Sequence, residues 1–145
     1  MIEGAAEREV SAQRNLDSFA TSTWRQPVGV RADTVDTSCE VLGQRFAAPI
    51  LTAPCGMAGA VHPDAEPGVF RAAASRGLGS VLSTTATRSL EMVARQGGHD
   101  GGWFQLYFLG GRAGAEELLD RAAAAGYRNL VLTLDTSVAG IRPRD

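Results

Sequence analysis

The fold is decided by residues 103–134, which read WFQLYFLGGRAGAEELLDRAAAAGYRNLVLTL. This stretch opens with the apolar run 103–107 and continues with apolar residues at helical spacing. It then reaches Gly126, a residue type that commonly ends helices, and a second apolar run at 130–134. The order of strand, helix and strand predicts two parallel strands joined by a helical crossover.

The same unit occurs twice before this stretch. The first copy begins with a strand at 49–53 that stops at Pro54, and its helix carries Pro67 in the first turn. The second copy has a strand at 80–84 and helical spacing over 90–94. Successive strands start between 23 and 31 residues apart, which is the spacing that right-handed parallel crossovers need. We therefore expect an α/β fold with four parallel strands.

The repeat alone fits both a closed barrel and an open doubly wound sheet. No glycine fingerprint of a dinucleotide site or a P-loop follows the first strand, and this favours the barrel. At 145 residues the chain is too short for a whole barrel. We expect a partial (β/α)8 TIM barrel of about the first four strands, forming one domain, 1–145.

The N-terminal third has a different pattern. A helix is predicted from Glu7 to Phe19, and the alternation in 39–46 predicts a small hairpin that acts as a lid or plug. We therefore divide the domain into residues 1–48, with this helix and hairpin, and residues 49–145, with the β/α units.

Composition excludes several classes of protein. The net charge is -2 and no basic tract stands out, so we expect no nucleic-acid partner. No apolar run is long enough for a membrane span, and the start lacks the pattern of a secretory signal, so we expect a cytoplasmic protein. Cys39 and Cys55 are expected to be reduced thiols, with no metal site. All 14 basic residues are arginine, so the chain has no lysine for Schiff-base chemistry or for neutralising a flavin anion.

Polar side chains cluster at the carboxyl ends of the predicted strands, where α/β folds build their sites. Hydroxyl and amide groups without a nearby His or Cys nucleophile suit the binding of a flat heteroaromatic ligand better than hydrolysis. The alternative is that each group only caps a strand end and bonds to loop backbone. The residues are Ser83, Thr84, Gln105, Tyr107, Thr133 and Asp135.

Spaced motifs over nearly the whole chain make the sequence similar to the FMN-dependent α-hydroxy-acid dehydrogenases and oxidases. In chain order the motifs are Gly4-Ala5-Ala6-Glu7, Leu42-Gly43, Ala53-Pro54-Cys55-Gly56, His62-Pro63-Asp64-Ala65-Glu66, Leu82-Ser83-Thr84, Trp103-Phe104-Gln105-Leu106-Tyr107 and Leu132-Thr133-Leu134-Asp135-Thr136, with Gly140 and Arg142. The resemblance implies that FMN is the cofactor.

The resemblance also implies roles for individual residues. The loop Pro54-Cys55-Gly56 would approach the flavin with its backbone, although the family usually carries threonine and alanine at the last two positions. Flavin-ring hydrogen bonds would come from Ser83, Gln105 and Thr133. Tyr107 would lie at the substrate face. Arg142 would meet the substrate carboxylate through its planar fork of donors, unless it is only a solvated loop charge.

The same resemblance places no catalytic residue in this chain. The family's histidine base, its partner arginine, its flavin-contacting lysine and its phosphate-binding glycines would lie beyond Asp145. His62 is expected to have a structural role, such as capping the helix that follows, and His99 is not a good candidate for the base. We therefore expect the isolated chain to bind FMN weakly or not at all.

Three functional hypotheses remain open. The leading one is FMN-dependent oxidation of a small L-2-hydroxy acid, of the lactate or glycolate type, to the 2-keto acid. The second is a non-catalytic half-barrel fragment or assembly module, and the third is another FMN-binding barrel enzyme. Because a half barrel leaves its outer strands unpaired, we also expect self-association or pairing with a complementing C-terminal half.

Overall fold

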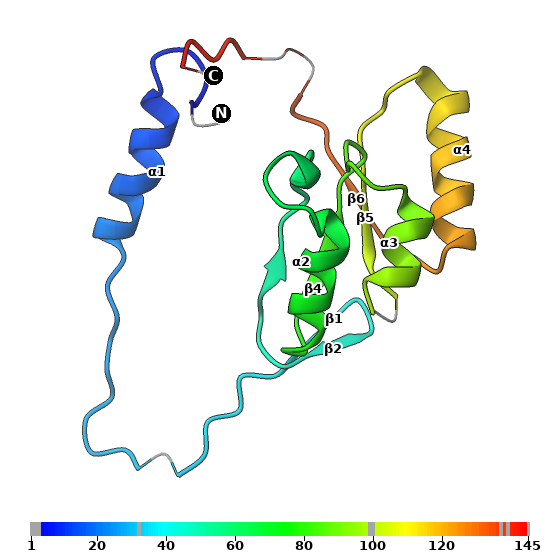
Figure 1. Ribbon diagram of the computed structural model, residues 1–145. Helices are drawn as coiled ribbons and strands as arrows, with labels where there is room; N and C mark the ends of the chain where they lie inside the picture. Colours follow the sequence, from blue (N-terminus) through cyan, green and yellow to red (C-terminus); the bar gives the residue numbers. More distant parts are fainter. Residues whose placement is uncertain (1–3, 32, 99–100, 137, 139, 145) are drawn as a thin grey trace. The chain divides into compact units, whose positions relative to one another are not determined.

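The computed structural model describes residues 4–31, 33–98, 101–136, 138 and 140–144 (Figure 1). The chain forms two compact units, the first made of Met1–Val35 with Asp135–Asp145 and the second of Asp36–Leu134. No helix among the described residues is long and apolar enough to cross a membrane. The predicted hairpin and β/α units all fall in the second unit.

The first unit contains helix α1, Val10–Thr21, which begins later than the predicted helix from Glu7 to Phe19. The backbone explains the difference, because Glu7 and Glu9 have φ angles of 53° and 59°, in the left-handed region that interrupts a right-handed helix. The Glu9 carboxylate pairs with Arg144 at 2.8 Å. The turn before α1 is therefore held from the other end of the chain.

The second unit begins with the predicted hairpin, which is confirmed. Strands β1, Cys39–Val41, and β2, Gln44–Phe46, pair in antiparallel fashion. Leu42 and Gly43 join them with φ angles of 48° and 74°. Two left-handed residues in a two-residue connection match the backbone twist that a tight hairpin requires.

Gln44 fastens this hairpin to the amino-terminal edge of the main sheet. Its amide nitrogen donates to the carbonyl oxygen of Gly101, and its amide oxygen accepts from the indole nitrogen of Trp103. The same oxygen accepts from the side-chain nitrogen of Asn129 at 3.2 Å. One side chain thus joins β2 to the starts of two strands.

The main sheet has four parallel strands in chain order, as predicted. The strands are β3, Leu51–Thr52, β4, Gly79–Leu82, β5, Trp103–Leu106, and β6, Asn129–Leu132. A doubly wound sheet reverses its strand order at a switch point, whereas this order runs in one direction like the wall of a barrel. The partial TIM barrel is confirmed, with β3 and β6 at the two edges.

Strand β3 is shorter than the predicted strand 49–53. Local turns replace the ladder on both sides, since the Ile50 nitrogen donates to the Ala48 oxygen at 2.7 Å and the Cys55 nitrogen to the Ala53 oxygen at 2.9 Å. Pro54 cannot donate to a neighbouring strand and ends the ladder. The strand is therefore reduced to the residues that pair with β4.

Helices follow the strands as the repeat predicts. They are the 3-10 turn η1, Ala58–Ala60, and the helices α2, Ala65–Ala74, α3, Leu90–Gln96, and α4, Gly111–Ala124. Helix α3 begins with a side-chain cap, because the Ser89 hydroxyl accepts a hydrogen bond from the Met92 nitrogen at 3.3 Å.

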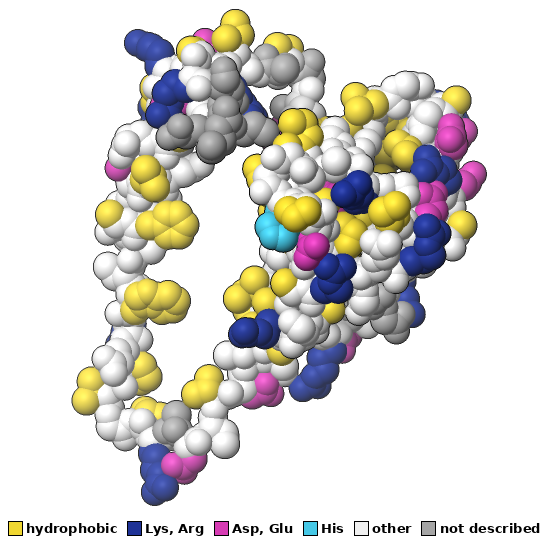
Figure 2. Space-filling model, in the orientation of Figure 1, with side chains coloured by type: hydrophobic (Ala, Val, Ile, Leu, Met, Phe, Trp, Pro, Cys, Tyr) yellow, Lys and Arg dark blue, Asp and Glu magenta, His cyan; other side chains and the backbone are white. Residues whose placement is uncertain are grey.

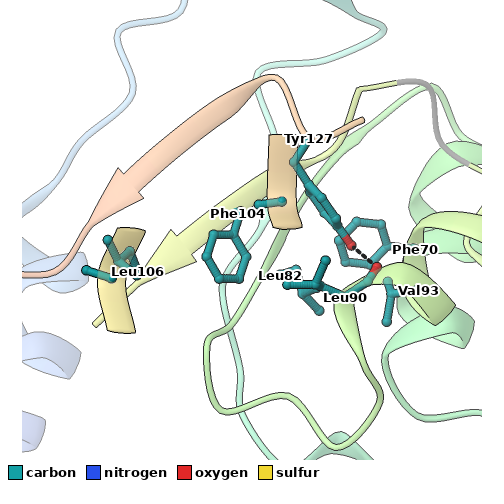
Figure 3. Close-up of a cluster of buried hydrophobic side chains, with 9 residues drawn as sticks. Phe70, Leu82, Leu90, Val93, Phe104, Leu106 and Tyr127 are labelled. Carbon is teal, nitrogen blue, oxygen red and sulfur yellow. Dashed lines mark hydrogen bonds between the residues drawn. The ribbon is translucent and has the colours of Figure 1, made fainter. Parts of the chain in front are cut away.

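The apolar core lies between the sheet and these helices (Figure 3). Phe104 of β5 and Tyr127 have ring centroids 6.0 Å apart, and the Tyr127 hydroxyl donates to the Leu90 oxygen at 3.0 Å. Burial raises the pKa of Tyr127, so the phenol stays protonated and keeps donating. The other core residues are Phe70, Leu82, Val93, Leu106, Ala115 and Ala122.

A surface ion pair joins two of the core helices on their outer side. Arg121 of α4 donates to both carboxylate oxygens of Glu91 in α3, at 2.8 and 3.2 Å. This hydrogen bonding lowers the pKa of Glu91 to about 2. Figure 2 shows basic and acidic side chains interleaved over the surface in this region.

We predict that replacing Gln44 by alanine detaches the hairpin from the sheet. The indole nitrogen of Trp103 and the amide of Asn129 would lose their acceptor, which costs about 1–3 kcal/mol. Urea unfolding followed by tryptophan fluorescence measures the loss; Trp24 is fully exposed, so the change reports Trp103. Glu40→Ala, at an exposed position of β1, is the control, and equal stability of the two variants would contradict the prediction.

Candidate functional site

The carboxyl edge of the sheet carries a chain of hydrogen bonds through one buried amide. Gln105, at the third position of β5, is 1% exposed. Its amide oxygen accepts from the Ser83 hydroxyl at 3.3 Å, and its amide nitrogen donates to the Thr133 hydroxyl at 2.8 Å. The structure therefore brings together three predicted cofactor residues from three neighbouring strand ends.

Thr84 fixes the orientation of this amide. Its backbone nitrogen donates to the amide oxygen of Gln105 at 3.2 Å, and its hydroxyl donates to the backbone oxygen of the same residue at 2.6 Å. The hydroxyl also accepts from the Tyr107 nitrogen at 3.0 Å. Because the amide oxygen receives two donors, the nitrogen must face Thr133.

Hydrogen-bonding capacity is left over after these contacts are made. A primary amide has two donors, and Gln105 gives one of them to Thr133. The Thr133 hydroxyl accepts that bond and keeps its own proton for donation. This edge can therefore present donors to the electronegative rim of a planar ligand.

A second segment, Pro54 to Gly56, follows β3 and approaches the loop after β4. Pro54 is half-buried, and Cys55 and Gly56 are exposed. The next residue, Met57, donates its backbone N–H to the Thr85 oxygen at 3.1 Å. The structure thus places this predicted flavin-facing segment beside the loop that starts at Ser83.

The Thr85 side chain occupies the space beside Gly56. A Cβ atom there would lie 2.2 Å from the Thr85 hydroxyl oxygen. That hydroxyl bonds to the Ser83 hydroxyl at 3.0 Å, and since Ser83 gives its proton to Gln105, Thr85 is the donor. The chain departs from the alanine usual in the family it resembles, and the neighbouring threonine occupies the space.

Sequence reasoning gave no role to one residue near this site, Glu66 in the first turn of α2. The side chain is buried, and its carboxylate accepts hydrogen bonds from Ala58, Thr87 and Arg88. Burial alone would raise the pKa of Glu66, but the bonds from Thr87 and Arg88 lower it below its usual range. An acid in a first turn usually indicates only a favourable contact with the helix dipole, and these loop partners were not visible in the sequence.

The structure shows fewer contacts for the two predicted substrate residues. Tyr107 is half-buried directly after β5, and its backbone is held by Thr84. Arg142 is exposed and belongs to the first compact unit, so its contact with a substrate carboxylate stays a prediction.

The histidines and cysteines give no competing site among the described residues. His62 accepts a hydrogen bond at Nδ1 from the Asp64 nitrogen at 3.2 Å, just before α2, which agrees with a structural role. His99 lies outside the described residues. Cys39 and Cys55 are free thiols, and no group of three or more His, Cys, Asp or Glu in the described ranges could hold a metal ion.

We predict that Gly56→Ala pushes the Thr85 hydroxyl away from Ser83. Overpacking of this kind costs about 1–3 kcal/mol, and the measurement is the free energy of unfolding in urea. Thr85→Ala in the same chain removes the clashing oxygen, so the cost of Gly56→Ala should be smaller in that background. Equal costs in the two backgrounds would show that Thr85 does not limit this position.

Comparison with known proteins agrees with this geometry. A family model described as FMN-dependent dehydrogenase matches residues 1–145. L-lactate oxidase from Nostoc sp. is 40% identical over 147 residues, in a match that covers 99% of this chain and 40% of the relative. Glycolate oxidase 1 from Zea mays is 37% identical over 140 residues, covering 97% and 38%.

Solved structures give the same result. A structure of an oxidized active mutant of (S)-mandelate dehydrogenase superposes with a TM-score of 0.93 at 38% identity and covers 99% of this chain. A structure of mandelate oxidase has a TM-score of 0.92 at 32% identity and covers 98%. The chain spans about 40% of the length of these relatives and neighbours. This chain belongs to the FMN-dependent dehydrogenase family.

Proposed function

We propose that this chain supplies the flavin-facing N-terminal strands of an enzyme that uses FMN to oxidise a small L-2-hydroxy acid, of the lactate or glycolate type, to the 2-keto acid. The observation that carries the proposal is the buried amide of Gln105, which joins Ser83 and Thr133 into one donor row at the carboxyl edge of the sheet. The curated relatives include a lactate oxidase and a glycolate oxidase.

The described residues fit the ring of the cofactor. The pyrimidine side of a flavin ring carries carbonyl oxygens and ring nitrogens, which accept hydrogen bonds from amide and hydroxyl donors. The remaining donors of Gln105 and Thr133 match those acceptors. The segment Pro54 to Gly56 adds a narrow backbone surface, since even a Cβ atom cannot be placed at position 56 without displacing the Thr85 hydroxyl.

When bound, FMN would supply the chemistry by accepting the hydride from the α-carbon. This chain's own residues would bind and orient. Arg142 would pair with the substrate carboxylate through two parallel hydrogen bonds, and Tyr107 would line the substrate face. Removal of the hydroxyl proton needs a base, and we assign no catalytic residue among the residues of this chain.

Two properties of the isolated chain follow from the proposal. Without further flavin contacts, FMN binding should be weak or absent. The edge strands β3 and β6 are open, and Leu130 and Leu132 of β6 are each 47% exposed, which favours self-association or pairing with a complementing C-terminal half.

We place the protein in the cytoplasm, acting on a small-molecule substrate.

A second candidate is a non-catalytic half-barrel assembly module. The observation in its favour is that the chain spans about 40% of its relatives and leaves both sheet edges open. Such a module would associate through these edges and would not need the donor row of Gln105 for any ligand.

The test is anaerobic titration of the purified chain with FMN, followed by L-lactate and glycolate. Bound flavin is measured by its fluorescence and reduction by loss of the oxidised band. We expect weak FMN binding that Gln105→Leu reduces by about tenfold or more, since an unpaired buried partner costs about 1–3 kcal/mol. Gln96→Leu, at an exposed position of α3, is the matched control.

Each outcome selects one hypothesis. FMN affinity that is the same in Gln105→Leu and in the parent chain would contradict the proposed ring contacts. Binding that appears only when a complementing C-terminal half is added would agree with the proposal, whereas no binding even then would favour the assembly module. Reduction of FMN by either hydroxy acid would show that the chain carries a base after all. If bound FMN is reduced by neither acid even after a complementing half is added, a different FMN enzyme would be favoured.

A further inference from the structure

We propose that Glu66 is a positioning residue whose buried carboxylate ties the loop after β3 to the loop after β4. These loops carry Pro54 to Gly56 and Ser83, so the inference rests on the proposed function for its meaning to the flavin. The tie itself rests on contacts within the second compact unit.

The carboxylate reaches both loops from α2. One oxygen, Oε1, accepts from the Ala58 nitrogen at 3.2 Å in the first loop. The same oxygen accepts from the Thr87 nitrogen at 2.7 Å and from its hydroxyl at 3.1 Å in the second loop. The other oxygen, Oε2, accepts from the Arg88 nitrogen at 3.2 Å. Four donors from two loops thus converge on one side chain.

The two loops also run beside each other between Glu66 and the flavin-facing residues. The Gly59 nitrogen donates to the Thr87 hydroxyl at 2.9 Å, and the Met57 nitrogen donates to the Thr85 oxygen at 3.1 Å. A Cβ on Gly59 would lie 2.7 Å from the Thr87 methyl carbon, so the approach is close. The contacts continue from Glu66 through Thr87 and Thr85 towards Ser83.

The negative charge of Glu66 is held by backbone and hydroxyl donors. Arg88 contributes its backbone nitrogen, while its guanidinium donates to the Pro63 oxygen at 3.4 Å. A carboxylate is acceptor-only and can satisfy all these donors, whereas a glutamine amide would turn an NH2 group towards one set of them. Glu66→Gln therefore keeps the size of the side chain and removes the hydrogen bonds that one of its two carboxylate oxygens accepts.

Helix stabilisation alone does not account for this arrangement. An acidic residue in a first turn lowers the energy of its own helix while exposed to water. Glu66 is instead 4% exposed, and its carboxylate accepts from Ala58, Thr87 and Arg88, which lie outside α2, 8 to 22 residues away along the chain. Burying a carboxylate is costly and is repaid here by loop contacts.

The test is amide hydrogen exchange, followed by NMR, on the full chain with Glu66→Gln. The informative amides are Met57 and Gly59, which bond across the two loops and do not touch Glu66. We expect both to exchange about tenfold faster in the variant, while the amides of Phe104 and Leu106 in β5 keep their rates within about twofold. Glu116→Gln removes an exposed carboxylate from α4 and should change neither set.

Two results would overturn the proposal. Faster exchange restricted to Ala58, Thr87 and Arg88 would show that Glu66 satisfies its own partners without holding the loops together. An equal acceleration in β5 would show that the residue only stabilises the whole unit. Thr87→Val gives a second reading if Glu66→Gln does not fold, because it keeps the charge and removes the hydroxyl that links Glu66 to Gly59. Gly59 loses its own acceptor in this variant, so Met57 is the informative amide and should again exchange faster.

FMN titration of the same variants separates this inference from the proposed function. If the parent chain binds FMN, Glu66→Gln should weaken binding several-fold and Glu116→Gln should not. If FMN binding is absent even after a complementing half is added, the proposed function fails, and the exchange rates of Met57 and Gly59 still decide whether Glu66 holds the loops.

Discussion

The buried amide of Gln105 needs hydrogen-bond partners, and this need links the fold to the candidate site. An amide that is 1% exposed must find partners for its oxygen and its nitrogen, because an unpaired buried polar group is costly. Its partners, Ser83 and Thr133, stand at the ends of the two strands that flank β5. Only parallel strands in this order bring the three side chains to one edge, so pairing the strands also assembles the donor row.

Side chains alternate along β5, so the two faces of the sheet make different kinds of contact. Phe104 and Leu106 enter the core beneath the helices, where Phe104 meets Tyr127. Trp103 and Gln105 alternate with them and make polar contacts, the indole with Gln44 at the amino end and the amide with Thr133 at the carboxyl end. The helix-facing side supplies apolar burial, while the other side fastens the hairpin at one end and presents donors at the other.

The sequence was sufficient for the fold and for the members of the donor row, because both depend on local patterns. Apolar runs at regular spacing predicted the strands, and polar residues at their carboxyl ends predicted a site there. The family resemblance implied Ser83, Gln105 and Thr133 as the flavin-ring residues among them. Element boundaries were less accurate, since the left-handed turn at Glu9 and the turns around Pro54 depend on distant or cooperative contacts. The role of Glu66 could not be predicted for the same reason, because its partners lie on loops that approach it only after folding.

The departure at position 56 can be understood from the same loops. Met57 and Gly59 are bonded to Thr85 and Thr87, so the path of the first loop is set by backbone contacts that do not involve the side chain at position 56. At that position the only space is taken by the Thr85 hydroxyl, which in turn donates to Ser83. Losing a methyl group at position 56 while a hydroxyl fills the space preserves contact between the loops. Variation at this point of the family pattern is therefore compatible with a flavin-facing backbone, because what the site requires is the spacing of the two loops.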